Sequence, residues 1–477
     1  MQNYWLRFCS RGAICLFLGW GCSPENAVSE TEARKQGPSL TLDYSPARSG
    51  HIFRGMGVAL YGQETQHLSR LHDLEVRYVR LEAGPSWASL PHSPPAQPGQ
   101  LARYVRNNFN YNDPDRLLRF QESFAYFQEH NIKSVLVFYQ QPYLWLQNDY
   151  MNTFRPGAEV NLIRLWVAVL KYLQKHGIRP DYVELANEPE GNWNGHIPRH
   201  RYHELVVQAR KQFDRVGLSH IQILGPGLST LNLEGRTPLW MDSMPVETEQ
   251  SLSAFSFHAW DDVLAEDRTL NFMRNAWDSL KQTLGRRNAQ KEIILTEYGW
   301  ELTRKGYNDY HSPRSRALFS VSDTHQYGIR YAANSLIHIN QGASAIVAWR
   351  LSDLNADYSS WGMVRSRDRG GTPRPFYHAF RFLSNQALQG SRVVMPASPL
   401  RDDTLEALLL CRDGRCVWIA VNTGMDWRRV AIEVTTQPVL YSVIRFREEG
   451  IRDFCVRKGS ELYIDLPPAS IGALQWW

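Results

Sequence analysis

Short apolar runs alternate with longer amphipathic stretches from His51 to about Leu388. Eight of the apolar runs have the length and composition of strands. They begin at His51, Val76, Lys133, Tyr182, Ile221, Ala254, Glu292 and Ala343. The intervening stretches include two helical patterns, Asp115 to His130 and Glu159 to Gly177, the second of which ends at a glycine. Eight alternations of strand and helix predict an α/β fold, a closed parallel (β/α)8 or TIM barrel, over residues 51–388.

Helical periodicity disappears beyond about Leu388, and short strand-like runs follow. They are TLEALLLC, CVWIAVN, VAIEVT, VLYSVIRF, ELYIDLP and IGALQWW. We therefore expect residues 389–477 to form a small antiparallel all-β sandwich domain after the barrel. Its expected role is to brace the barrel through a shared interface, and carbohydrate binding is the alternative.

The N-terminal residues have the pattern of an export signal. Two arginines precede the apolar run 12–21, which is shorter than the roughly 20 residues of a membrane-spanning helix. Cys22 follows a small residue, as at the cleavage site of a bacterial lipoprotein, although the bulky Trp20 departs from that pattern. We expect a signal peptide over residues 1–22, and lipidation of Cys22 is a hypothesis.

Residues 23–50 are polar and contain three prolines, which suits a linker between the membrane and the folded body. Within it, the segment Ser39–Tyr44 (SLTLDY) alternates well enough to be one strand, which could join the β domain. The protein is expected to be exported to the periplasm, the outer membrane or the cell surface, with a lipid anchor at Cys22 as its only link to a membrane. Without that anchor it would be secreted.

The charge of the chain is nearly balanced. The formal net charge is +5, and without Arg7 and Arg11 of the expected signal it becomes 5 minus 2, or +3. No run of five or more like charges occurs, so the sequence has no electrostatic signature of nucleic-acid binding.

None of the six cysteines has the spacing of metal ligands, so we expect neither a metal nor another cofactor. Cys411 and Cys416 flank Arg-Asp-Gly-Arg between two apolar runs, and a hairpin would bring them opposite each other. Cys411 and Cys416 could form a disulfide or remain a pair of free buried thiols, and the sequence does not decide between these two possibilities.

Two glutamates stand where predicted strands give way to polar turns. Glu188, in YVELANEPEG, ends the fourth predicted strand, and Glu297, in EIILTEYGW, ends the seventh. Catalytic groups of such barrels come from the C-terminal ends of the strands. A pair of carboxylates in two different electrostatic environments is what cleavage of a glycosidic bond requires.

With these motifs, residues His51 to about Leu388 resemble the clan A glycoside hydrolases, the barrels that include the cellulase-like family 5 and families 30 and 39. The resemblance implies that Asn187 binds the 2-hydroxyl of the sugar. It further implies that Glu188 is the acid/base and Glu297 the nucleophile of a retaining β-glycosidase.

Arg80, on the second predicted strand, matches the position whose guanidinium keeps the nucleophile ionised in that clan. The alternative is an ordinary ion pair inside the barrel, for example with Glu184, and Arg77 is the competing candidate for the role.

His258 lies at the end of the sixth predicted strand, where relatives have a histidine followed two residues later by a tyrosine. Here that second position is Trp260, so either another phenol such as Tyr298 takes its place beside the nucleophile or the site is tuned differently. Trp349 ends the eighth strand and resembles the aromatic floor under the cleaved sugar. A place in the core is the alternative for any single tryptophan.

Further aromatic residues in or near the predicted βα loops could extend a sugar-binding cleft. They are Tyr139, Tyr143, Trp145, Trp193, Trp300 and Trp361. The long, Pro-rich segment after Glu82 could wall one side of the site, and Glu190 is expected to be a solvated loop residue.

The resulting prediction is a retaining glycoside hydrolase that cleaves β-linked poly- or oligosaccharides through a covalent glycosyl-enzyme. The sequence has no phosphate-binding loop, no Gly-x-Ser-x-Gly motif and no His-Glu-x-x-His motif. Two alternatives are a non-catalytic polysaccharide-binding lipoprotein on the same scaffold and a transglycosylase that uses the same two glutamates.

Overall fold

The computed structural model describes most of the chain between Ser39 and Trp476. The described residues are 39–60, 68–84, 97–111, 113–138, 154–155, 157–191, 196–231, 236–262, 270–287, 290–301, 321–353, 362–365, 370–434, 440–447, 450–458 and 462–476. The expected signal peptide and Cys22 lie outside them. Within these ranges, no helix is both long enough and apolar enough to cross a membrane.

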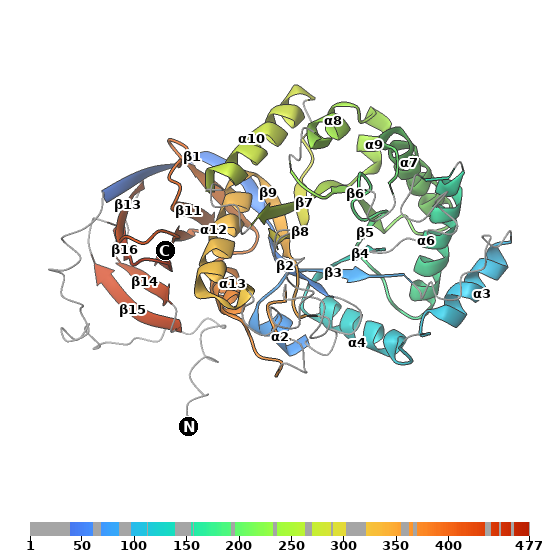
Figure 1. Ribbon diagram of the computed structural model, residues 1–477, viewed down its shortest axis with the longest axis horizontal. Coiled ribbons are helices and arrows are strands. Elements are labelled where there is room, and N and C mark those ends of the chain that lie inside the picture. Colours follow the sequence, from blue (N-terminus) through green and yellow to red (C-terminus); the bar gives the residue numbers. More distant parts are fainter. Residues whose placement is uncertain are drawn as a thin grey trace.

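Eight parallel strands close into a barrel in the order in which they occur along the chain (Figure 1). They are β2 (Gly55–Leu60), β3 (Tyr78–Glu82), β4 (Lys133–Val137), β5 (Tyr182–Glu184), β6 (Gln222–Leu228), β7 (Ala254–Asp262), β8 (Ile293–Glu301) and β9 (Ala343–Ala348). The ring is closed because β2 pairs with both β3 and β9. The predicted (β/α)8 barrel is confirmed.

Helices surround the barrel (Figure 1). They are α2 (Leu68–Asp73), α3 (Pro98–Asn108), α4 (Arg116–Glu129), α6 (Ala158–Lys175), α7 (Arg199–Arg215), α8 (Arg236–Asp242), α9 (Val246–Ser251), α10 (Leu270–Arg286), α12 (His325–Gln341) and α13 (Pro375–Gln386), with the short 3-10 helix η3 (Val321–Asp323) before α12. The two helical patterns found in the sequence correspond to α4 and α6.

The helix α6 shows how the sequence pattern leads to packing. Its buried side chains recur every three or four residues, and Trp166 among them stacks on Phe138 beyond β4 with ring centroids 3.8 Å apart. The indole nitrogen of Trp166 also donates to the carbonyl of Leu185 at 3.1 Å. Gly177, with φ of +80°, ends the helical run.

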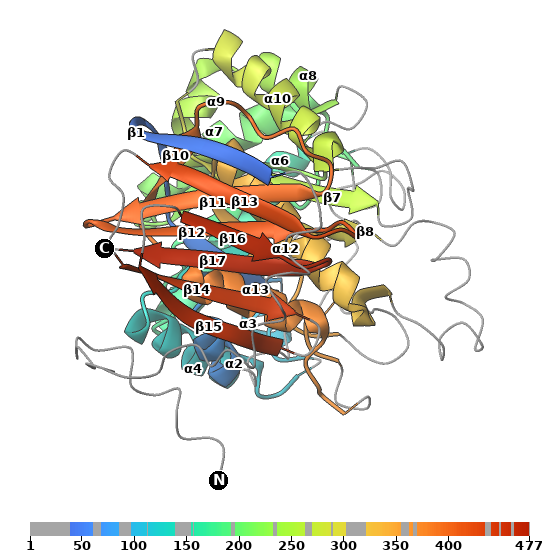
Figure 2. The same cartoon turned by 90° about the vertical axis from the view of Figure 1, so that its left-hand side faces the viewer.

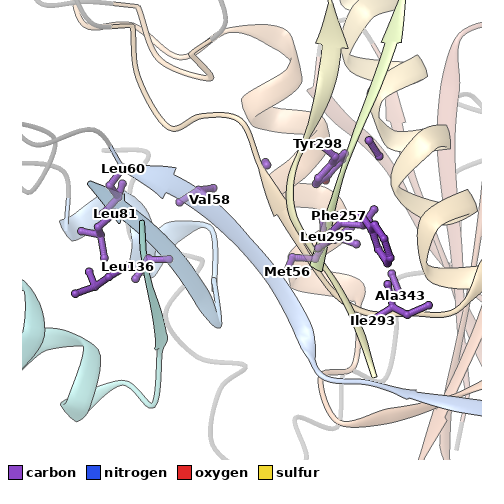
Figure 3. Close-up of a cluster of buried hydrophobic side chains, with 14 of the residues drawn as sticks. Met56, Val58, Leu60, Leu81, Leu136, Phe257, Ile293, Leu295, Tyr298 and Ala343 are labelled. Carbon is purple, nitrogen blue, oxygen red and sulfur yellow. The ribbon is translucent and has the colours of Figure 1, made fainter. Parts of the chain in front are cut away.

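The barrel strands are apolar on both faces, which explains their continuous hydrophobic runs. One set of side chains, including Tyr78, Val135 and Ile294, forms a cluster of its own. Alternating residues such as Leu136 and Leu295 belong to the larger core that the strands share with the helices (Figure 3).

The second sheet has nine strands and begins with a segment that precedes the barrel. Its strands are β1 (Ser39–Phe53), β10 (Ser391–Pro396), β11 (Leu405–Arg412), β12 (Arg415–Asn422), β13 (Arg428–Val434), β14 (Leu440–Arg447), β15 (Gly450–Lys458), β16 (Leu462–Leu466) and β17 (Ser470–Trp476). Their order is β15-β14-β17-β12-β11-β10-β1-β13-β16, and only the β1–β13 pair is parallel among the described pairs of this sheet. The predicted C-terminal β domain is confirmed, whereas the boundaries at residues 50 and 388 remain predictions.

The run read as one strand from His51 to Leu60 is divided between the two sheets. β1 ends at Phe53 in the nine-stranded sheet, and β2 starts at Gly55 in the barrel. Gly55 has φ of +146°, and a Cβ there would lie 2.9 Å from the side chain of Arg77. The corner therefore requires glycine, and hydrophobic periodicity does not reveal it because apolar residues stand on both sides of it.

The helices α12 and α13 lie between the barrel and the nine-stranded sheet (Figures 1 and 2). Leu408 and Leu410 of β11 pack into the core shared with these helices, whereas Leu409 packs into a second core on the opposite face. Between the two parts, Arg274 of α10 donates to Glu406 of β11 at 2.6 Å, with both side chains buried.

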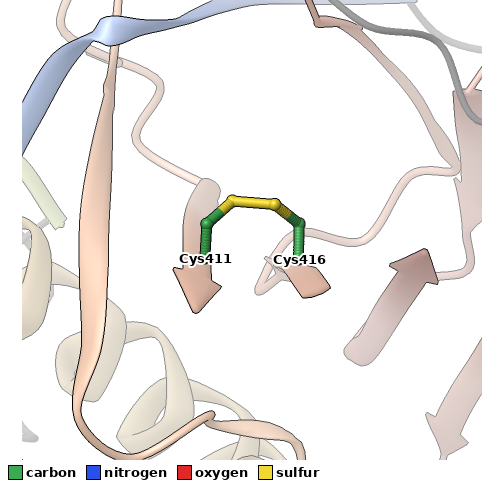
Figure 4. Close-up of a disulfide and its surroundings, with 2 residues drawn as sticks. All are labelled: Cys411 and Cys416. Carbon is green, nitrogen blue, oxygen red and sulfur yellow. A yellow bond between two sulfur atoms is a disulfide. The ribbon is translucent and has the colours of Figure 1, made fainter. Parts of the chain in front are cut away.

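The hairpin formed by β11 and β12 carries a disulfide. Cys411 and Cys416 are direct partners in the register of the two strands, and their sulfur atoms are bonded (Figure 4). The sequence left open a disulfide or a pair of free buried thiols, and the structure contains the disulfide.

Candidate active site

The side chains predicted for the site lie on five barrel strands or just beyond their C-terminal ends. They are Arg80 on β3, Asn187 and Glu188 after β5, His258 and Trp260 on β7, Glu297 and Tyr298 on β8, and Trp349 after β9. Seven of the eight gather at this end of the barrel, and Tyr298 is the exception described below.

Arg80 connects three of these groups and Glu184 from a fully buried position. Its Nη1 donates to Glu297 Oε2 at 2.7 Å, and its Nε donates to Glu184 Oε2 at 2.8 Å. Its Nη2 donates to Asn187 Oδ1 at 2.7 Å and lies 3.3 Å from His258 Nε2. The planar guanidinium suits this arrangement because its donors point in several fixed directions. Arg80 therefore makes both the contact that the family resemblance implies and the alternative ion pair with Glu184.

A bulge on β8 sets the direction of Glu297. Phe257 pairs with Leu295 and His258 pairs with Glu297, so Thr296 is an extra residue on β8 at this point. Thr296 donates its hydroxyl to Glu184 Oε1 at 2.7 Å, while Glu297 meets Arg80. The bulge thus lets two successive side chains reach the same buried cluster.

Glu188 stands on a turn held against β6. Its φ of +46° lies in the left-handed region, which is uncommon for a residue other than glycine. Its backbone nitrogen donates to the carbonyl of Gly227 at 3.1 Å. A Cβ on Gly227 would lie 3.2 Å from Glu184 Oε1, so glycine allows β6 to approach the cluster closely.

The carboxylates of Glu188 and Glu297 face each other with His258 between them. One oxygen of each glutamate and a ring nitrogen of the histidine lie within 4.8 Å of one another. His258 Nδ1 is 2.8 Å from Glu188 Oε1 and 3.8 Å from Glu297 Oε2. The site therefore presents two carboxylates at close range, joined through an imidazole.

The electrostatics of Glu297 are a balance of opposing effects. Burial raises the pKa of Glu297, and so do the neighbouring charges of Glu188 and Glu184, while His258 and Arg80 oppose the rise. Because the two carboxylates are so close, a negative charge on Glu188 disfavours one on Glu297, whereas the ion pair with Arg80 favours it.

The pKa values of His258 and Glu184 are shifted in opposite directions. Burial disfavours the charged form of His258, but Glu297 and Glu188 outweigh it and raise its pKa. Burial would likewise favour neutral Glu184, but Arg80, His258 and the Thr296 hydroxyl lower its pKa. Glu184 is therefore a permanent negative partner of Arg80.

Glu188, His258 and Glu297 also offer three atoms that could ligate a cation. However, the Arg80 guanidinium already bonds to Glu297 Oε2 and lies beside His258 Nε2. Its fixed positive charge would repel a divalent ion at the same oxygen, so these residues fit proton transfer better than they fit a metal.

Two indole rings lie near the C-terminal ends of β7 and β9. The rings of Trp260 and Trp349 lie 6.5 Å apart at 72°, and both residues are half-buried. A Cβ on Gly299 of β8 would lie 2.8 Å from the Trp260 ring, so the ring rests directly on the backbone of the neighbouring strand. Two apolar ring faces at this angle could contact the C–H groups of a sugar.

Tyr298 does not provide the missing phenol. Its hydroxyl is 2.9 Å from Ser335 Oγ on α12, and its ring packs against Tyr331 and His338. The expectation that it lies beside the nucleophile is wrong, because Tyr298 follows Glu297 directly and neighbouring side chains of a strand point to opposite faces.

Glu190 is not the solvated loop residue that we expected. Its Oε1 accepts the backbone N–H of Ser229, and its Oε2 is buried without a hydrogen-bond partner among the described residues. Burial raises the pKa of Glu190, the hydrogen bonds from Ser229 oppose this, and the nearby Glu188 adds to the rise.

The remaining candidates lie elsewhere. Arg77 donates to the carbonyl of His130 at 3.0 Å and bonds to Gln389, away from the carboxylates. The side chains of the loop aromatics lie outside the described part of the structure, as do residues 85–96 of the Pro-rich segment. The later part of that segment forms the helix α3, which the expectation of one long loop did not foresee.

Thr296 and Gly227 of the buried cluster were not predicted from the sequence, and Glu184 was considered only as an alternative partner of Arg80. Thr296 and Gly227 gave no chemical signal in isolation, although the Gly-Pro-Gly of β6 marks an irregular strand. Glu184 could have been found from its charge inside the apolar run Tyr182–Ala186.

The sequence matches no protein-family model, and no curated protein sequence matches it. Solved structures do match the fold. A GH30 endoxylanase from Clostridium papyrosolvens C71 has a TM-score of 0.64 at 12% identity, over 91% of this chain and 99% of its own. An endo-β1,6-glucanase has a TM-score of 0.63 at 14% identity, over 91% of this chain and 94% of its own. A family 51 α-L-arabinofuranosidase from Bifidobacterium longum has a TM-score of 0.59 at 13% identity, over 93% and 98%. This chain therefore has the barrel and β-domain fold found in these glycoside hydrolases.

Proposed function

We propose that this protein is a glycosidase that cleaves β-glycosidic bonds with retention of configuration. The observation that carries the proposal is the approach of Glu188 and Glu297, since one carboxylate oxygen of each lies within 4.8 Å of the other. Retaining enzymes hold their carboxyl groups about 5 to 5.5 Å apart, whereas inverting enzymes leave about 6.5 to 9.5 Å for a water molecule.

In the first step, Glu297 attacks the anomeric carbon while Glu188 gives its proton to the departing sugar oxygen. The bond between Glu297 and the sugar forms as the glycosidic bond breaks, and the leaving group departs as a neutral alcohol. Arg80 supports this division of roles because it places its positive charge 2.7 Å from Glu297 Oε2.

In the second step, Glu188 acts as a base. Once Glu297 is esterified its negative charge is gone, so Glu188 more readily holds a charge of its own. It takes a proton from water, the water oxygen bonds to the anomeric carbon, and Glu297 leaves as a carboxylate. The contact with His258 at 2.8 Å fixes the Glu188 carboxyl in both steps.

The substrate we propose is a β-linked glucan, a xylan or a bacterial exopolysaccharide. Asn187 would contact the 2-hydroxyl, and the Trp349 ring would pack under the cleaved sugar, with Trp260 at its side. The structural neighbours are named for different sugars, so the fold does not select among these substrates.

The test is a screen of β-linked polysaccharides and aryl β-glycosides with the full-length protein and its Glu297→Ala variant. The variant should lose turnover, and azide should restore it with a glycosyl azide of inverted configuration as product. Glu204 on α7 is exposed, so Glu204→Ala is the matched control and should keep full activity. Unchanged activity in Glu297→Ala would remove the proposal.

Two other functions remain as alternatives on the same scaffold. Product analysis at high acceptor concentration identifies a transglycosylase, in which a sugar resolves the intermediate in place of water. Affinity for a glycan without cleavage identifies a polysaccharide-binding protein, although such a protein has no use for the Arg80 ion pair with Glu297.

For location, we propose export through the N-terminal segment, with lipidation of Cys22 as the means of membrane attachment. Mass spectrometry of the mature protein tests this directly. An uncleaved N-terminus or an unmodified Cys22 would exclude the lipid anchor.

A further inference from the structure

Glu190 is a third carboxylate near Glu188 and Glu297 to which the proposed reaction gives no role. It lies two residues after Glu188, on the turn closed by the hydrogen bond from the Gly191 nitrogen to the Glu188 carbonyl at 3.0 Å. Its side chain points to β6 and accepts the backbone N–H of Ser229, the residue that follows this strand.

Two connections thus join the turn to β6 beyond the point where β5 ends. β5 pairs with β6 only from Tyr182 to Glu184. Further along, the Glu188 nitrogen donates to the Gly227 carbonyl at 3.1 Å, and two residues later the Glu190 carboxylate accepts from Ser229. The second connection uses a side-chain oxygen where a regular ladder would use a backbone carbonyl.

The backbone conformation of Glu188 explains why the second connection is made by a side chain. Its φ of +46° turns the chain out of the extended conformation, so the next residues cannot continue the ladder. Such a conformation persists only when its surroundings hold it in place. A glutamate at position 190 is long enough to bridge back to β6 and accept the Ser229 amide.

We propose that Glu190 is a positioning residue that clamps the turn carrying Glu188 onto β6 and thereby holds the acid/base group in line with the leaving oxygen. This inference rests on the proposed glycosidase function. It assigns Glu190 no contact with the substrate, and its effect is exerted through the position of Glu188.

The clamp is tested with Glu190→Ala, Glu190→Asp and Glu190→Gln. Alanine removes the acceptor, aspartate keeps the charge but is one methylene shorter, and glutamine keeps an oxygen at the same reach. The substrates are dinitrophenyl and phenyl glycosides of β-xylose and β-glucose, because only the phenyl leaving group needs a proton. The readout is kcat/KM, which reports formation of the glycosyl-enzyme.

Glu190→Ala and Glu190→Asp should lower kcat/KM for the phenyl glycoside by about tenfold to 100-fold and change that for the dinitrophenyl glycoside little. Glu190→Gln should restore most of the loss. If Glu190 served stability alone, its substitution would lower kcat/KM for both substrates together, and that result would overturn the proposal. A Glu190→Gln variant as impaired as Glu190→Asp would overturn it as well. If the alanine variant fails to fold, the contrast between aspartate and glutamine decides.

Hydrogen exchange of the Ser229 amide tests the clamp without turnover. Exchange should be faster in Glu190→Asp than in the unaltered protein and should stay slow in Glu190→Gln. Equal exchange in all three refutes the clamp. An unaltered protein that cleaves no glycoside, yet shows this exchange pattern, would refute the proposed glycosidase function and leave the clamp in place.

Discussion

Arg80 and Glu297 form an ion pair with Nη1 and Oε2 2.7 Å apart, and the arginine side chain has no exposed surface. The same guanidinium holds Glu184 and Asn187, so one side chain fixes the charge and the direction of the proposed nucleophile. An ion pair buried this deeply is not screened by solvent as a surface pair is.

Arg80→Lys should lower kcat/KM by about 100-fold, because an ammonium cannot hold the three partners in the same geometry. With the positive charge held less closely, the pKa of Glu297 should rise further, and the acidic limb of the pH–rate profile should move to higher pH. Steady-state kinetics across pH check both effects. The matched control is Arg77→Lys, which alters a neighbouring arginine outside the site, and equal behaviour of the two variants would contradict the role given to Arg80.

Gly299→Ala should lower kcat/KM by about tenfold, because the new methyl group would lie 2.8 Å from the Trp260 ring and would displace it. Gly285 on α10 has no atom within 4 Å of an added Cβ, so Gly285→Ala is the control. The control should keep full activity and gain about 0.5 to 1 kcal/mol of stability. Kinetics together with thermal unfolding of both variants test this, and a fully active Gly299→Ala enzyme would show that the ring position is unimportant.

His338 should make the protein sensitive to acid. Burial lowers its pKa to about 3, so the folded protein keeps it neutral while the unfolded chain protonates it near 6.5. The unfolded state therefore binds more protons between these values, and stability is lost as pH falls through that window, by about 1.4 kcal/mol for each pH unit.

The measurement is the free energy of unfolding at several pH values for the unaltered protein and for His338→Gln. Glutamine can still accept the hydrogen bond from Trp277 Nε1 but does not titrate. Its stability should fall less steeply below pH 6.5. The exposed His220→Gln serves as the control, and a slope shared by all three proteins would mean that His338 does not cause the loss.

The Cys411–Cys416 bridge should be found by peptide mapping without reductant. It closes a short loop, for which the chain-entropy model gives about 2 kcal/mol of stabilisation. A Cys411→Ser, Cys416→Ser double variant should therefore unfold at lower denaturant concentration. A midpoint equal to that of the unaltered protein would show that the short hairpin is closed equally well without its bridge.

The apolar runs predicted the barrel because each strand is buried on both faces, and they placed Glu188 and Glu297 at strand ends for the same reason. The pattern could not show the bulge at Thr296, since the apolar run Ile293 to Leu295 before it looks the same whether or not a residue is inserted. That bulge brings both Thr296 and Glu297 to the buried cluster. Glu190 was misjudged on similar grounds, because its acceptor role depends on Ser229, which is distant in the sequence.

The family resemblance supplied what periodicity could not, namely which arginine should approach Glu297. It also suggested Tyr298 as a substitute phenol, but the alternation of side chains along β8 directs Tyr298 away from Glu297 and towards Ser335. Roles inferred by analogy therefore depended on backbone details that only the three-dimensional arrangement provides.

The buried pair of Arg274 and Glu406 has a consequence for any attempt to shorten the protein. A chain cut after the barrel would retain the guanidinium and lose its carboxylate, together with the apolar strands that cover α12. An isolated charge in such a place costs several kcal/mol. The nine-stranded sheet and the barrel thus form one cooperative folding unit, and heating should unfold both parts in a single transition.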